Sequence, residues 1–123
     1  MAALRYTEDH EWIRVESDGT ATVGITDHAQ DSLGDIVFIE LPDVDRKAAK
    51  GEAVCIVESV KAAADVKMPV AGTIVAVNSA LPDDPSKVNT DPLKDGWFIR
   101  IKADTPADLD ALMDDAAYQA LIA

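Results

Sequence analysis

The sequence contains few of the residues that support cross-linking, metal binding or nucleophilic chemistry. Among its 123 residues are one cysteine, Cys55, and two histidines. A single cysteine excludes an internal disulfide, and neither histidine has metal-ligand spacing with the cysteine or the other histidine. Cys55 lies in the apolar run 53–57 with no adjacent cationic residue, which favours a small buried side chain over a reactive thiol.

Motifs that mark common enzyme classes are also missing. The chain has no phosphate-binding G-x-x-x-x-G-K-[ST] loop, no dinucleotide-binding G-x-G-x-x-G and no G-x-S-x-G nucleophile turn. His10 lies between acids and could act as a general base, but a structural or surface role is favoured for it. For His28, inside the expected short helix, a helix-surface or packing role is favoured. With 23 acidic residues, paired carboxylates are expected by chance. The sequence therefore predicts a protein that is not an enzyme.

Basic residues and long apolar runs are scarce as well. Eleven bases stand against 23 acids, for a net charge of −12, which disfavours nucleic-acid binding and favours docking on basic protein surfaces. No apolar run approaches the ~18 residues of a membrane span. The first residues, MAALRYTEDHEW, resemble neither a secretory signal nor a transit peptide. We expect a bacterial-type cytoplasmic protein that binds no membrane.

Short apolar segments separated by turn residues predict a single, mainly β domain over residues 1–123, either a small sandwich or a barrel. A short helix is expected over 26–33, with a threonine cap before it and Gly34 after it. A C-terminal helical extension is expected over about 105–123, with Thr105 as its cap and Pro106 at the first helical position. Residues 78–96 are predicted to be a long surface excursion. The expected strands are 12–15, 20–25, 36–41, 52–59, 64–68, 73–77 and 97–101.

The stretch ESVKAAADVKMPVAG, residues 58–72, predicts a hairpin with Lys61 at its turn. This turn has no Gly, Asn or Asp at its centre, although those residues dominate turns. A lysine amine on a flexible stem is a good target for covalent modification. With an ordinary pKa near 10.4, however, it needs a modifying enzyme to supply an activated group. The residue pattern alone leaves two interpretations open, a modified lysine and an ordinary solvated turn lysine.

Six segments together resemble the glycine cleavage H-protein family, in the order in which that family has them. They are YTEDHEW, VGITDHAQDSLGD, FIELPDV, ESVKA, VNTDP and GW. Each segment alone is a weak signal, whereas the ordered set spans residues 5–121 and is highly specific.

This resemblance implies the barrel-sandwich hybrid fold of lipoyl and biotinyl carriers, with a short internal helix and C-terminal helices. It also implies lipoic acid in amide linkage to Lys61. Such a carrier receives the aminomethyl group of glycine from a pyridoxal-phosphate glycine decarboxylase and passes it to a tetrahydrofolate-dependent aminomethyltransferase. Dihydrolipoamide dehydrogenase then reoxidises its dithiol. The carrier itself is expected to be non-catalytic.

The resemblance also assigns roles to residues around Lys61. Glu58 and Gly72 match positions that the family uses for recognition by lipoylating enzymes. Glu11, Asp65 and Asp9 match positions expected to shelter the loaded arm, whose cationic amine nearby carboxylates would stabilise.

Three alternatives share the same lysine. A biotin carrier usually has methionine on both sides of it, where this chain has Val60 and Ala62. A lipoyl domain of a 2-oxo acid dehydrogenase complex usually shows Asp-Lys-Ala and flexible linkers, and this chain has neither. A lipoyl donor or relay protein for 2-oxo acid dehydrogenase complexes remains open, because the same lysine would serve it.

Overall fold

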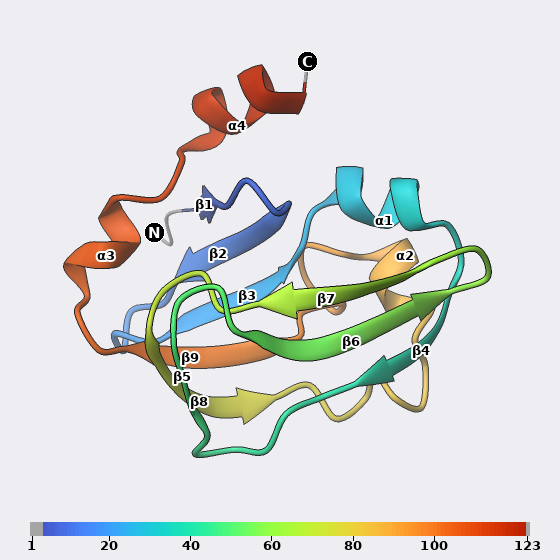
Figure 1. Cartoon of the computed structure of the whole chain (residues 1–123), viewed down its shortest axis with the longest axis horizontal. Coiled ribbons are helices and arrows are strands. Elements are labelled where there is room, and N and C mark those ends of the chain that lie inside the picture. Colours follow the sequence, from blue (N-terminus) through green and yellow to red (C-terminus); the bar gives the residue numbers. More distant parts are fainter. Residues whose placement is uncertain (1–3, 123) are drawn as a thin grey trace.

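The computed structural model describes residues 4–122, which form two antiparallel β-sheets with four short helices at their margins (Figure 1). The six-stranded sheet has the order β1-β2-β3-β9-β8-β5. Its strands are β1 (Leu4–Tyr6), β2 (Glu11–Val15), β3 (Ala21–Ile25), β5 (Lys47–Ala48), β8 (Gly72–Val77) and β9 (Ile99–Ala103). The three-stranded sheet has the order β4-β6-β7. It consists of β4 (Ile36–Glu40), β6 (Ala53–Ser59) and β7 (Ala63–Lys67).

The helices lie outside the sheets. Helix α1 (Asp27–Leu33) follows β3, and α2 (Lys87–Thr90) lies in the connection between β8 and β9. Helices α3 (Ala107–Asp110) and α4 (Asp115–Ile122) form the C-terminal part. In Figure 1 the β6–β7 turn projects at one end of the molecule, and α3 lies at the other end.

The two sheets share one apolar core. Strands direct alternate side chains to opposite faces. Val57 and Val66 of the smaller sheet belong to the same buried cluster as Ile13 and Val23 of the larger one. A separate aromatic cluster of Tyr6, Trp12 and Tyr118 joins β1 and β2 to α4. The main core fixes the β6–β7 hairpin, and the aromatic cluster attaches the C-terminal helix.

Most of the expected elements are present. The mainly β architecture and the helix after β3 agree with the prediction, and the Thr26 side chain accepts a hydrogen bond from Ala29 N–H as an N-cap does. The expected cap at Thr105 is wrong. Pro106 occupies the N-cap of the single-turn helix α3, and no side chain caps it. Residues 1–3 and 123 of the expected single domain lie outside the described residues.

Three short elements escaped prediction: β1, the two-residue strand β5, and α2 inside the expected excursion 78–96. The expected strand 97–101 is displaced toward the C-terminus, because β9 begins at Ile99. Between residues 4 and 122, no helix has the length and apolar character needed to cross a membrane.

Candidate functional site

The turn between β6 and β7 places Lys61 at an exposed tip, beside Val60, which is 68% exposed. Ser59 holds this turn in the absence of turn residues. Its Oγ accepts hydrogen bonds from Lys61 N–H at 3.3 Å and Ala62 N–H at 3.0 Å, and donates to the Ala62 carbonyl at 3.2 Å. Serine hydroxyls can replace backbone partners in this way. The turn therefore presents Lys61 from a fixed backbone.

The segment that ends α1 supports the tip from one side. Val60 N–H donates to the Asp35 carbonyl at 3.0 Å. A Cβ added to Gly34, the C-cap of α1, would lie 3.4 Å from Lys61 Cε, so the lysine stem lies over this glycine. The Asn89 side chain of α2 fixes the same segment, because it donates to the Gly34 carbonyl and accepts from Ile36 N–H, each at 2.9 Å.

A cleft of about 290 Å³ lies between α1, the start of β2 and the β6–β7 hairpin. Two of the elements that line it lead to Lys61: α1 has its C-cap at Gly34, against the lysine stem, and β7 begins at Ala63, after the turn. With a rise of ~3.3 Å per strand residue, the four steps from Lys61 to Asp65 span roughly 13 Å. The cleft is lined by Asp9, His10, Glu11, Ile25, His28, Ala29, Ser32, Leu33, Val57, Ala64, Asp65 and Val66.

Glu11 is a buried carboxyl group in the cleft, with 2% exposure. It accepts a hydrogen bond from Lys67 N–H at 2.7 Å and another from the Thr7 hydroxyl at 3.0 Å. Desolvation nevertheless outweighs these bonds and raises its pKa from 4.5 to about 7. Glu11 thus braces the backbone of β7 against β2. Each of its oxygens keeps a second lone pair for another donor.

Asp9 and Asp65 are the more accessible acids of the cleft. The Asp9 side chain is 51% exposed, and its Oδ1 lies 4.0 Å from Lys67 Nζ. Asp65 is exposed on β7, where it pairs with Ile56 of β6. All three residues expected to shelter a loaded arm therefore line one cleft, and their roles there stay predictions.

The two residues expected to guide lipoylation lie in different sheets. Glu58 is exposed on β6, three residues before Lys61, and pairs with Ala63. Gly72 lies in β8 of the larger sheet, where an added Cβ would be 2.5 Å from the carbonyl oxygen of Lys102. The close packing of β8 against β9 explains why a glycine occupies position 72. Recognition of either residue by a modifying enzyme stays a prediction.

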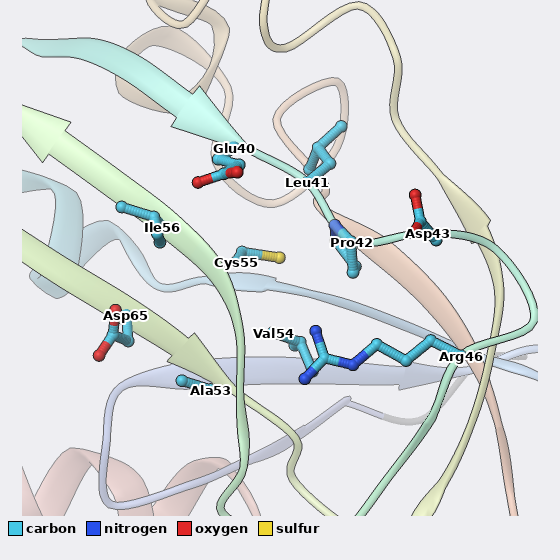
Figure 2. Close-up of a pocket in the computed structure, with 10 residues that line it drawn as sticks. All are labelled: Glu40, Leu41, Pro42, Asp43, Arg46, Ala53, Val54, Cys55, Ile56 and Asp65. Atoms are coloured by element: carbon cyan, nitrogen blue, oxygen red, sulfur yellow. The ribbon is translucent and has the colours of Figure 1, made fainter.

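Another cavity, of about 400 Å³, lies over the β4–β5 connection and the start of β6 (Figure 2). Figure 2 shows the Cys55 sulfur pointing toward Pro42 and the Arg46 side chain reaching toward Val54. Cys55 is 1% exposed, and burial raises the pKa of its thiol to about 12. The thiol stays protonated at neutral pH, as a buried structural cysteine does.

Ser59 and Asn89 are site residues that sequence reasoning missed. Both stand within the family-like segments ESVKA and VNTDP, but nothing in the spacing indicated that their side chains would fix the turn and its support. Across residues 4–122, no group of three or more His, Cys, Asp or Glu side chains is placed to hold a metal ion.

Comparison with known proteins gives consistent matches over nearly the whole chain. A family model described as "Glycine cleavage H-protein" matches residues 4–123. Glycine cleavage system H proteins of Rhodospirillum rubrum and of a Psychrobacter species are 52% and 56% identical to the chain. These alignments cover 99% and 95% of the chain, and 97% and 93% of those proteins.

The fold matches a solved structure as well. The crystal structure of a glycine cleavage system H protein from Mycobacterium marinum superposes with a TM-score of 0.87 at 37% identity. The match covers 96% of this chain and 94% of that one. It confirms the predicted fold class, the barrel-sandwich hybrid.

Proposed function

Because the chain belongs to the glycine cleavage H-protein family, we propose that Lys61 is the residue to which its lipoyl group is attached. The chain is a lipoyl carrier of the glycine cleavage system. The observation that supports Lys61 is its place on an exposed, side-chain-fixed turn. The other lysine of the hairpin, Lys67, lies within β7 near Asp9. A modifying enzyme would find it on a hydrogen-bonded strand and not on an exposed turn.

The residues around the tip fit a lipoyl arm. An arm of about ten single bonds reaches roughly 12–14 Å, which matches the roughly 13 Å along β7 from Lys61 to Asp65. When attached, the lipoyl group supplies a dithiolane whose disulfide accepts the aminomethyl group by reduction.

The cleft offers both apolar walls and acids. Leu33 and Val57 contribute apolar side chains to its wall. Asp9 and Asp65 place carboxylates where a cationic amine would lie. Glu11, whose pKa burial raises to about 7, adds its negative charge as the pH rises through neutrality. We infer that these three residues shelter the loaded arm between partner enzymes.

The carrier works with enzymes that supply the chemistry. We infer that it receives the aminomethyl group from a pyridoxal-phosphate glycine decarboxylase and delivers it to a tetrahydrofolate-dependent aminomethyltransferase. Dihydrolipoamide dehydrogenase restores its disulfide, and a lipoylating enzyme recognises Glu58 and Gly72. The chain contributes presentation and shelter rather than catalysis. Its cytoplasmic location stays a prediction.

Intact mass spectrometry tests the attachment site. The protein is incubated with lipoic acid, ATP and a lipoate ligase, as wild type, as Lys61→Arg and as Lys67→Arg. One lipoyl group is expected on wild type and on Lys67→Arg, and none on Lys61→Arg. Modification that disappears in Lys67→Arg and persists in Lys61→Arg would overturn the proposal.

A further inference from the structure

Helix α4 is attached to the rest of the molecule by the buried side chain of Tyr118 and by the half-buried Ile122, which packs against the same aromatic cluster. Of its residues Asp115–Ile122, Tyr118 is buried, with 2% exposure. The Tyr118 ring stacks on Tyr6, with centroids 4.5 Å apart and planes inclined by 6°. This stack directs the phenol oxygen away from α4, toward the start of α1 and the loop that precedes β2.

The phenol oxygen joins a chain of hydrogen bonds that ends in the wall of the cleft. Tyr118 Oη lies 2.7 Å from Thr26 Oγ1 and 2.9 Å from His10 Nδ1. Thr26 is 3% exposed and accepts from Ala29 N–H at 3.2 Å. His10 lines the cleft. These hydrogen bonds thus link the N-terminus of α1, through Tyr118 of α4, to the wall of the cleft.

Only one arrangement of the hydrogens in the Thr26–Tyr118–His10 hydrogen bonds gives every hydroxyl hydrogen an acceptor. If Thr26 donates to Tyr118, then Tyr118 donates to His10 Nδ1, and each hydroxyl hydrogen has an acceptor. In the opposite order His10 Nδ1–H donates to Tyr118 and Tyr118 donates to Thr26. The buried Thr26 hydrogen then has no acceptor among residues 4–122. Buried polar groups are nearly always paired, so the first order is favoured.

We propose that Tyr118 is a positioning residue of the cleft, which holds His10 as the neutral tautomer protonated on Nε2. Protonation of Nδ1 would leave the hydroxyl hydrogen of either Thr26 or Tyr118 without an acceptor in these two hydrogen bonds. Burial and the neighbouring His28 also lower the pKa of His10, and Asp9 acts in the opposite direction. The remaining titratable groups that line the cleft with His10 are Glu11 and Asp65.

A neutral His10 affects the charge of the cleft. The importance of that charge rests on the proposed function. His10 and His28 lie with ring centroids 4.8 Å apart, beside the acids that would face a cationic amine. A protonated His10 would add positive charge there and repel the amine. A neutral His10 leaves the acids as the main charges of the wall. Helix α4 thereby acts on a cleft with which it shares no lining residue.

NMR of the histidine ring nitrogens tests the tautomer in the full-length, unlipoylated protein. In wild type, His10 is expected to carry its hydrogen on Nε2 and to have a pKa below 6.5. In Tyr118→Phe the ring stack remains but the hydroxyl is lost. The His10 pKa should then rise, because the hydrogen bond that favours the neutral ring is lost, and both tautomers should be populated. The matched control is Tyr6→Phe, which removes the other hydroxyl of the stack and should leave His10 unchanged.

Two results would overturn the tautomer assignment. One is a wild-type His10 protonated on Nδ1, which requires no variant to detect. The other is the same His10 pKa in Tyr118→Phe as in Tyr6→Phe. Neither measurement depends on lipoylation, so failure of the attachment at Lys61 would be recognised separately by mass spectrometry.

A second measurement tests the effect on the cleft. The loaded carrier is followed for loss of its aminomethyl group as formaldehyde and ammonia between about pH 6 and pH 8. Tyr118→Phe should lose it faster than Tyr6→Phe toward the acidic end of this range, because loss of the hydroxyl raises the pKa of His10 and favours its charged form. Equal loss rates in the two variants across this range would overturn the influence of Tyr118 on the cleft.

Discussion

At the scale of single residues, Glu11 has two opposing effects on stability, one from its hydrogen bond and one from the burial of its charge. Its carboxyl group accepts a hydrogen bond from Lys67 N–H that joins β2 to β7, yet burial raises its pKa from 4.5 to about 7. A raised pKa means that the folded state binds the proton more tightly than the unfolded state. Glu11 therefore adds stability below about pH 4.5 that is lost as the pH rises toward 7.

The stability of the protein should show this loss directly. At 1.36 kcal/mol per pKa unit, the contribution of Glu11 is about 3 kcal/mol between these limits. Glu11→Gln imitates the protonated form, so its free energy of unfolding should fall less steeply between about pH 5 and pH 8. Urea unfolding at several pH values measures the slope.

The matched control is Glu58→Gln, which removes one exposed acid and so changes the net charge equally. Its slope should stay close to that of wild type. Equal slopes in the two variants would show that burial of Glu11 does not govern the pH dependence.

Asp65 provides a second prediction at this scale. Asp65→Asn removes a carboxylate from the cleft without changing its size, so loss of the aminomethyl group should accelerate. The expected factor is roughly two to five, because exposed ion pairs contribute little. Release of formaldehyde by the loaded carrier is the measurement. The control is Glu40→Gln, which replaces an exposed acid on β4 outside the cleft and should leave the rate unchanged. If Asp65→Asn loses the aminomethyl group no faster than Glu40→Gln, Asp65 has no part in sheltering the arm.

Single residues also show how much of the candidate site could be predicted from the sequence. Lys61 was ambiguous from its own neighbours, and only the ordered family segments favoured modification. Ser59 and Tyr118 gave no such signal, because their importance lies in which atoms they meet. The partner of Tyr118 at His10 is 108 residues away in the chain, and no local pattern encodes that contact.

At the scale of elements, long apolar segments were predictable and short ones were not. β6 and β8 carry enough β-branched residues in alternation to be identified from sequence. β1 and β5 have three and two residues, too few to show a period. Both are strands because a neighbour offers a free edge, β2 for β1 and β8 for β5.

Gly72 yields a prediction about the pairing of β8 with β9. An added Cβ would lie 2.5 Å from the backbone oxygen of Lys102, so the two strands must separate or shift. Gly72→Ala should lower the free energy of unfolding by about 2–3 kcal/mol. Denaturant titration provides the measurement.

Gly19→Ala is the control for this substitution. Gly19 has a φ of +89° and no atom within 4 Å of the added Cβ, so it should lose about 1 kcal/mol from backbone strain alone. A smaller loss for Gly72→Ala than for Gly19→Ala would contradict the packing explanation. If folded Gly72→Ala is lipoylated at the normal rate, Gly72 has no part in recognition.

At the scale of the whole molecule, the net charge of −12 is the dominant property. Such a charge accelerates encounter with basic partner surfaces, and salt screens it over a Debye length of about 10 Å at 0.1 M. The kcat/KM of glycine decarboxylase for the lipoylated carrier should therefore fall as ionic strength rises. Steady-state kinetics over a salt series would measure this.

Free lipoamide serves as the comparison, because it offers the same dithiolane without the charge of the carrier. Its kcat/KM should change much less with salt. Parallel declines for carrier and lipoamide would mean that salt acts on the enzyme and not on the encounter.

The turn at Ser59 has a consequence for how often the arm meets a catalytic centre. The Ser59 hydroxyl accepts a hydrogen bond from Lys61 N–H, and the Asp35 carbonyl accepts one from Val60 N–H. These bonds hold the backbone at Lys61, so an arm attached there would swing from a fixed pivot. An arm of about 14 Å that sweeps a hemisphere explores roughly 6,000 Å³, which corresponds to a local concentration on the order of 0.3 M. A turn that wandered by a comparable distance would enlarge the swept volume several-fold and dilute the arm accordingly. The stiffness of a three-residue turn thus sets the concentration at which a docked enzyme encounters its substrate.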